Sequence, residues 1–180
     1  MRDFAAFLRG INVGGHRVKG PELCAVFEQL GCREVSTFRA SGNVVFDAGP
    51  ELEAELAARI QKGLEEALGY EAITFLRPAK EVKAIAGNEP FESALVDRSR
   101  GKLQVAMLGS KPSANARKGV LALATDEDRL AFGERELYWL PTGGTQDSDL
   151  DFKAIDEALG TSTVRTKGTV EQIAAKHFSD

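Results

Sequence analysis

The chain of 180 residues is 43% apolar and 28% charged, an ordinary globular balance and a length that suits two compact half-domains. Its net charge of −4 and pI near 5.4 argue against a dedicated nucleic-acid binder, because such proteins usually present a basic surface. No stretch approaches the roughly 18 apolar residues of a membrane span, and the apolar run at residues 4–8 is too short for a signal peptide. We therefore expect a cytoplasmic protein without a membrane partner.

The first half of the chain is predicted to contain six elements. In chain order they are a strand at residues 4–8, a helix at 21–30, strands at 34–39 and 43–47, a helix at 50–68 and a strand at 72–76. Pro21 at the first helical position and Gly31 after the last mark the ends of the first helix. The order strand, helix, strand, strand, helix, strand is typical of ferredoxin-like folds.

The second half repeats this order after a connector at residues 78–101, which begins with a short helix at 78–86. The predicted elements are a strand at 103–107, a helix at 112–124, a hairpin of 129–132 and 137–140, a helix from Ser148 to Leu159, a strand at 162–166 and a terminal helix at 169–177. We interpret Ser148 as the cap of its helix. The expected fold is α+β: two ferredoxin-like (βαββαβ) half-domains in tandem, residues 1–77 and 102–180, with a C-terminal helix.

The loop from Gly10 to Lys19, called here the Gly10–Lys19 loop, joins a strand to a helix N-terminus. Such a loop exposes backbone amides and the positive end of a helix dipole, which suit a phosphate or carboxylate. Arg9, Arg17 and Lys19 add charge, and residues 1–46 hold six basic and four acidic side chains, so the rest of the chain carries −6. No Walker or dinucleotide-binding glycine pattern is present. The alternative is that the glycines only permit positive φ angles.

The connection Ala40-Ser41-Gly42-Asn43 has the chemistry of a tight turn between strands. It also brings Ser41 and Asn43 toward the same end of the sheet as the Gly10–Lys19 loop if the strands pair accordingly. The chain's two histidines, His16 and His177, and its two cysteines show neither zinc-ligand spacing nor a nucleophile's surroundings. We therefore predict no metal, no cofactor and no particular catalytic residue.

Two N-terminal motifs resemble a bacterial family known as domain of unknown function 1697. They are Leu8-Arg9-Gly10-Ile11-Asn12-Val13-Gly14-Gly15, followed by Lys19, and Ser41-Gly42-Asn43-Val44-Val45-Phe46. The resemblance implies a cytoplasmic α+β protein with ferredoxin-like subdomains and implies no reaction. A late family motif that looks like Thr-x-Arg-Asn-Trp-Asn-Thr-Val is altered here, since Thr163-Val164-Arg165 continues as Thr166-Lys167-Gly168. Arg165 still matches it.

The favoured hypothesis is that the Gly10–Lys19 loop binds a small anionic or phosphorylated ligand. The candidate ligand-binding residues are Arg9, Gly10, Asn12, Gly14, Gly15, Lys19, Ser41, Asn43 and Arg165. One alternative is a non-enzymatic protein–protein interaction module. A weaker one is an RNA-binding protein, because the strand at residues 43–47 lacks the paired aromatics of RNA-recognition modules.

Overall fold

The computed structural model describes residues 2–39 and 42–179 of the chain. They form two compact units. The first unit comprises Met1–Lys83 and Ile173–Asp180, and the second comprises Ala84–Gln172. Each unit contains a four-stranded antiparallel sheet with helices, so the predicted α+β class is confirmed. Among the described residues, no helix combines the length and the apolar character needed to cross a membrane.

The first unit begins with a strand that becomes one of the two central strands of its sheet. Its elements are β1 (Phe4–Arg9), α1 (Gly20–Gln29), β2 (Arg33–Thr37), β3 (Asn43–Asp47), α2 (Glu53–Leu68), β4 (Ile73–Pro78) and the start of α3 (Ala79–Gly87). The strand order is β2-β3-β1-β4, and every neighbouring pair is antiparallel. Because β1 and β2 both run antiparallel to β3, their C-terminal ends lie at the same edge of the sheet. The start of β4 lies there too.

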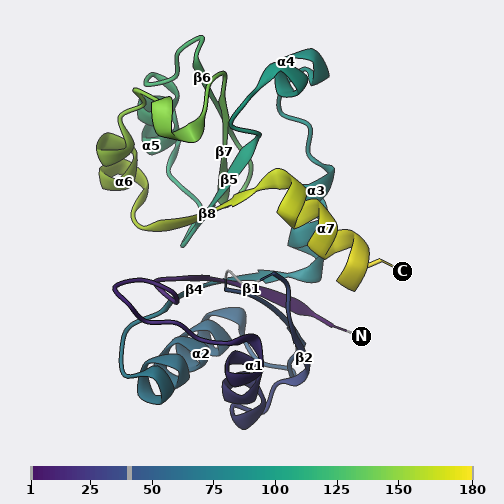
Figure 1. The fold of residues 1–180 in the computed structure, drawn as a ribbon. Helices are drawn as coiled ribbons and strands as arrows, with labels where there is room; N and C mark the ends of the chain where they lie inside the picture. Colours follow the sequence, from purple (N-terminus) through teal and green to yellow (C-terminus); the bar gives the residue numbers. More distant parts are fainter. Residues whose placement is uncertain (1, 40–41, 180) are drawn as a thin grey trace. The chain divides into compact units, whose positions relative to one another are not determined.

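The core of the first unit lies between one face of this sheet and helices α1 and α2, which cover the same face (Figure 1). The helix α2 places Leu56, Ile60 and Leu64 one turn apart, and all three are fully buried. Val44 and Phe46 of β3 alternate onto the same core because successive strand residues point to opposite faces. Each such side chain contributes roughly 1.5–3 kcal/mol through its burial, which fixes the register of the strands beneath.

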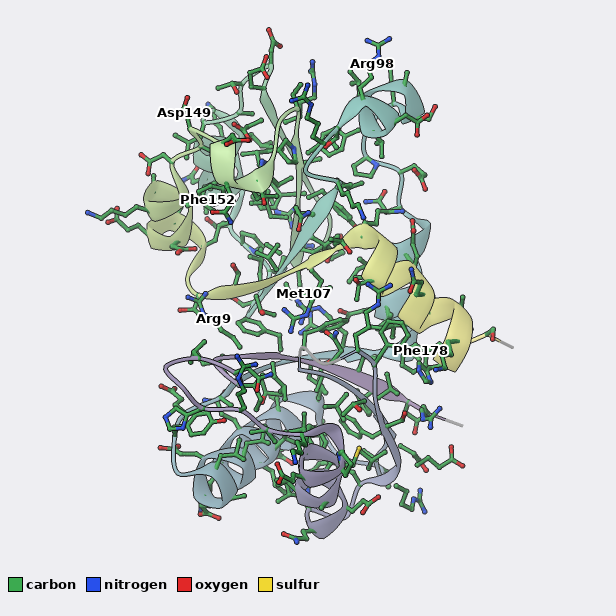
Figure 2. The ribbon with its side chains drawn as sticks, viewed as in Figure 1. Arg9, Arg98, Met107, Asp149, Phe152 and Phe178 are labelled. Atoms are coloured by element: carbon green, nitrogen blue, oxygen red, sulfur yellow. The ribbon has the colours of Figure 1, made fainter. Side chains whose placement is uncertain are left out.

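The second unit repeats the same strand order. Its elements are α4 (Ser93–Arg98), β5 (Gln104–Leu108), α5 (Ala114–Leu121), β6 (Asp128–Phe132), β7 (Glu136–Pro141), the 3-10 turn η1 (Thr145–Asp147), α6 (Phe152–Leu159), β8 (Ser162–Thr166) and most of α7 (Lys167–His177). The sheet runs β6-β7-β5-β8 with antiparallel neighbours throughout. Helices α5 and α6 share a core with Leu130, Leu137 and Trp139. Phe152 extends from the start of α6 and meets Trp139 edge-on, with ring centroids 4.9 Å apart (Figure 2).

Several helix starts differ from the sequence prediction. Helix α2 begins at Glu53 rather than at Pro50. Helix α6 begins at Phe152, and its cap is Asp151, whose carboxylate accepts the Ala154 N–H at 2.9 Å. The expected cap, Ser148, instead donates to the Asp128 carboxylate at 2.8 Å. The helix α4 was not predicted, because its short charged sequence carries no apolar periodicity.

Candidate functional site

Three parts of the first unit meet at the sheet edge where β1 and β2 end and β4 begins: the loop after β1, the chain just beyond β2, and the segment that leads into β4. The Gly10–Lys19 loop leaves β1 there, and the segment between α2 and β4 lies beside it. The Tyr70 hydroxyl donates to the Ile11 carbonyl oxygen at 2.7 Å, and the Tyr70 ring stacks on His16 with centroids 4.1 Å apart. Burial raises the pKa of Tyr70, so the phenol stays protonated and keeps this hydrogen bond at neutral pH.

The Gly10–Lys19 loop is also braced from within. The Asn12 side-chain oxygen accepts the Val18 N–H at 3.0 Å, which ties the start of the loop to its end. Gly14 and Gly15 have φ angles of 58° and 85°, and open space surrounds both positions. These two glycines therefore serve the backbone conformation of the loop, whereas Asn12 holds its shape.

A pocket of about 420 Å³ opens between this loop, the start of α1 and the end of β2; we call it the loop pocket. Its lining residues are Ile11, Asn12, Arg17, Val18, Lys19, Gly20, Glu22, Leu23, Thr37, Arg39 and Gly42. Two glycines set the close approach of its walls. A Cβ atom on Gly20 would lie 2.9 Å from Thr37 Oγ1, and one on Gly42 would lie 2.9 Å from Ile11 Cγ2.

The rim of the loop pocket is basic. Arg17 and Lys19 come from the Gly10–Lys19 loop, and Arg39 comes from the chain just beyond β2. Glu22 is the one acidic side chain among the described lining residues, and its carboxylate accepts the Lys19 backbone N–H at 3.0 Å. The described lining therefore carries a net charge of +2 on a chain whose total is −4.

Arg39 is held in an unusual backbone conformation. Its φ angle is 56°, in the left-handed region that non-glycine residues seldom adopt. The segment around it is closed by two hydrogen bonds: Phe38 N–H donates to the Asn43 carbonyl at 2.9 Å, and Asn43 Nδ2 donates to the Phe38 carbonyl at 3.1 Å. The Arg39 guanidinium lies 5.7 Å from the Phe38 ring centroid. These contacts lie directly beside Arg39, which lines the pocket rim.

Some of the residues predicted from the sequence line the loop pocket, and others do not. Asn12 and Lys19 line the loop pocket. The remaining predictions have other places: Arg9 ends β1 (labelled in Figure 2), Gly10 approaches the Glu71 carbonyl oxygen, Gly14 and Gly15 shape the loop, Asn43 closes the strand connection, and Arg165 lies on β8 of the second unit. Ser41 lies outside the described residues.

Nine of the eleven described lining residues were not among the candidates from the sequence, and those with polar or charged side chains are Arg17, Glu22, Thr37 and Arg39. Arg39 in particular is twenty residues away from Lys19 along the chain, and only the pairing of β2 with β3 brings it to this edge. The available signal was its position at the end of the strand predicted at residues 34–39. Within the described part of the chain, no group of three or more His, Cys, Asp or Glu side chains is placed to hold a metal ion.

Comparisons with known proteins agree with this architecture. A conserved bacterial protein from Streptococcus pneumoniae, SP0830, superposes with a TM-score of 0.71 at 20% sequence identity, and the match covers 97% of each chain. At that identity the likeness concerns the fold. No curated protein matches the chain. The model of the family described as "Protein of unknown function (DUF1697)" matches residues 1–138, and the chain therefore belongs to that family.

Proposed function

We propose that the first unit binds a small anionic ligand in the loop pocket. The observation that carries this proposal is the convergence of Arg17, Lys19 and Arg39, from two separate segments, around a hollow of about 420 Å³. Several cations gathered around one hollow attract an anion together, because each of them adds to the Coulomb attraction at that place. A bound anion also gains charge-assisted hydrogen bonds, which are among the strongest in proteins.

The construction of the pocket supports a binding role. Asn12, Tyr70 and the close approach of Gly42 to Ile11 hold the wall in one conformation. Pre-ordered walls reduce the entropy that ligand binding must overcome. A mobile loop with solvated basic side chains would not need these restraints.

The binding proposal is accompanied by proposals on the fold of each unit and on the cellular compartment. We propose that each unit is a ferredoxin-like half, a view supported by the shared order 2-3-1-4 of its strands. We further propose that residues 78–101 connect the two halves and that the protein works in the cytoplasm. The remaining sequence candidates, Arg9 and Arg165 among them, carry no part of the binding proposal.

Thermal unfolding of the full chain at low ionic strength tests the proposal. We expect phosphate-bearing anions to raise the melting temperature of the wild-type protein, and the double variant Arg17→Ala/Lys19→Ala to lose most of that rise. Lys62→Ala is the matched control, because the Lys62 side chain is 76% exposed on α2 and lies 3.7 Å from the Glu66 carboxylate. The proposal fails if no anion stabilises the wild type, or if the double variant responds as the wild type does.

A further inference from the structure

We infer that the loop pocket takes an organic phosphate monoester, with the phosphate on the basic rim and an apolar body over the pocket floor. This inference rests on the proposed anion-binding function and narrows its ligand class. Three properties of the described lining support it: the volume, the net charge and the division between a charged rim and an apolar floor.

The volume is too large for a bare inorganic anion. A water molecule occupies about 30 Å³ in the liquid, and an ion of five heavy atoms would leave most of the 420 Å³ to solvent. Pockets for organic ligands typically span about 300–1,000 Å³. The loop pocket falls within that range, so it has room for a body attached to the anionic group.

The net charge of the lining matches a phosphate monoester. Three cations and Glu22 leave +2, and a phosphate monoester carries about −1.5 to −2 at neutral pH. A single carboxylate supplies only one negative charge toward the +2 of the lining. A polyphosphate would bring more negative charge than the rim balances and would place it near the Glu22 carboxylate. The charge balance therefore favours one phosphoryl group with a single ester link.

The floor of the pocket is apolar. Ile11 and Leu23 are 5% and 4% exposed and belong to the core of the first unit, and Val18 packs against that core. These side chains have no hydrogen-bonding groups, so water against them is easily displaced by a hydrocarbon or aromatic body.

Isothermal titration calorimetry of the full chain at low ionic strength tests this inference with four probes. The probes are phenyl phosphate, inorganic phosphate, benzoate and tripolyphosphate. We expect phenyl phosphate to bind at least 10-fold more tightly than each of the other three. Equal affinities of phenyl phosphate and inorganic phosphate, or tighter binding of benzoate or tripolyphosphate, would overturn the inference while leaving an anion site in place. Failure of all four to bind would overturn the proposed function as well.

A pair of variants separates the floor from the rim. Val18→Thr keeps the side-chain shape but replaces a methyl group with a hydroxyl, so phenyl phosphate should bind about 5-fold more weakly while inorganic phosphate is unaffected. Val164→Thr, at a side chain 45% exposed in the second unit, is the matched control. Arg39→Gln should weaken both ligands. If Val18→Thr changes the affinities for phenyl phosphate and inorganic phosphate equally while its thermal unfolding is unaltered, the apolar contact is contradicted. If Val18→Thr does not fold, Val18→Ala takes its place in the same test.

Discussion

The two units share a strand order, yet the equivalent edges of their sheets are built differently. In the first unit, Arg17, Lys19 and Arg39 surround a pocket. In the second unit, the connection after β5 carries Lys111, whose ammonium lies 2.7 Å from the Glu134 carboxylate in the turn after β6. Arg117 on α5 donates to two carbonyl oxygens of that same turn, at 2.8 and 2.9 Å, and covers the Phe132 ring.

The two sheets have the same strand order, so the different placement of the cations comes from the sequences of the connections at this edge. In the second unit, Lys111 and Arg117 both bind groups of the neighbouring turn. The hydrogen bond and the charge of Lys111 hold the pKa of Glu134 below its usual value. In the first unit the loop is braced by Asn12 and Tyr70, neither of which is charged. We propose that the basic side chains of that edge face a ligand.

The largest expected effect is a loss of stability on substitution of Gly42, which lies in the wall of the loop pocket. Gly42 has a φ of 74°, and a Cβ there would lie 2.9 Å from Ile11 Cγ2 and 3.3 Å from the Leu8 carbonyl oxygen. Gly42→Val should therefore lower the free energy of unfolding by about 2–4 kcal/mol, measured by urea denaturation.

Gly14→Val is the matched control for that substitution. Gly14 also has a positive φ, but no atom outside its immediate chain neighbours would lie within 4 Å of a Cβ at this position. This variant should lose only about 1 kcal/mol, the conformational term alone. Equal losses at Gly14 and Gly42 would show that crowding at the pocket wall contributes nothing.

Charge reversal should distinguish the two edges directly. Lys19→Glu removes a charge-assisted contact and adds repulsion, so the affinity for phenyl phosphate should fall roughly 10- to 100-fold by calorimetry. Lys111→Glu, on the equivalent edge of the second unit, should leave the affinity unchanged. A comparable loss in Lys111→Glu would mean that the second edge, not the loop pocket, receives the anion.

A smaller gain is expected from removing the acidic side chain of the rim. Glu22→Gln keeps an oxygen to accept the Lys19 N–H but removes a negative charge near the bound anion. The affinity for phenyl phosphate should rise roughly 2- to 5-fold at low salt, and added salt should diminish the gain. Weaker binding in this variant would indicate that Glu22 contacts a donor group on the ligand.

The smallest expected effect concerns acid sensitivity of the first unit. Burial, followed by the charges of Arg2 and Lys176, lowers the pKa of His177, whose Nδ1 accepts a hydrogen bond from Arg2 at 2.9 Å. The neutral ring is therefore favoured in the folded state. Its stabilising contribution is present above the unfolded pKa of about 6.5 and is lost as pH falls through the lowered folded value.

Urea denaturation across that pH range checks the sign. Wild-type stability should decline with falling pH more steeply than that of His177→Gln, which cannot take up the proton. Parallel pH profiles of the two proteins would contradict the contribution of His177.

The order of strands and helices was predictable because apolar periodicity and glycine stops are local signals. The strands at 43–47 and 162–166 coincide with β3 and β8. Helix caps were less predictable, because Ser148 has a distant partner: the Asp128 carboxylate accepts both its hydroxyl and the Trp139 indole N–H, at 2.8 and 2.7 Å. Nothing near Ser148 in the sequence indicates that competition.

The residues of the loop pocket likewise fall into those that local sequence indicated and those that it did not. Asn12 and Lys19 lie within one loop, so local composition indicated them. Arg39 reaches the pocket only through strand pairing and an unusual backbone angle, and Thr37 through its close approach to Gly20. Residues that a single loop supplies could be predicted, whereas those that the sheet brings in required the structure.

The most direct test of the account is a titration of phenyl phosphate into isotopically labelled full-length protein, followed by amide chemical shifts. We expect the largest shift changes to fall on the loop pocket, at Lys19, Gly20 and Gly42, with little change at the equivalent edge around Lys111 and Glu134. Shift changes centred on Lys111 and Glu134, or no saturable change at the loop pocket, would contradict it.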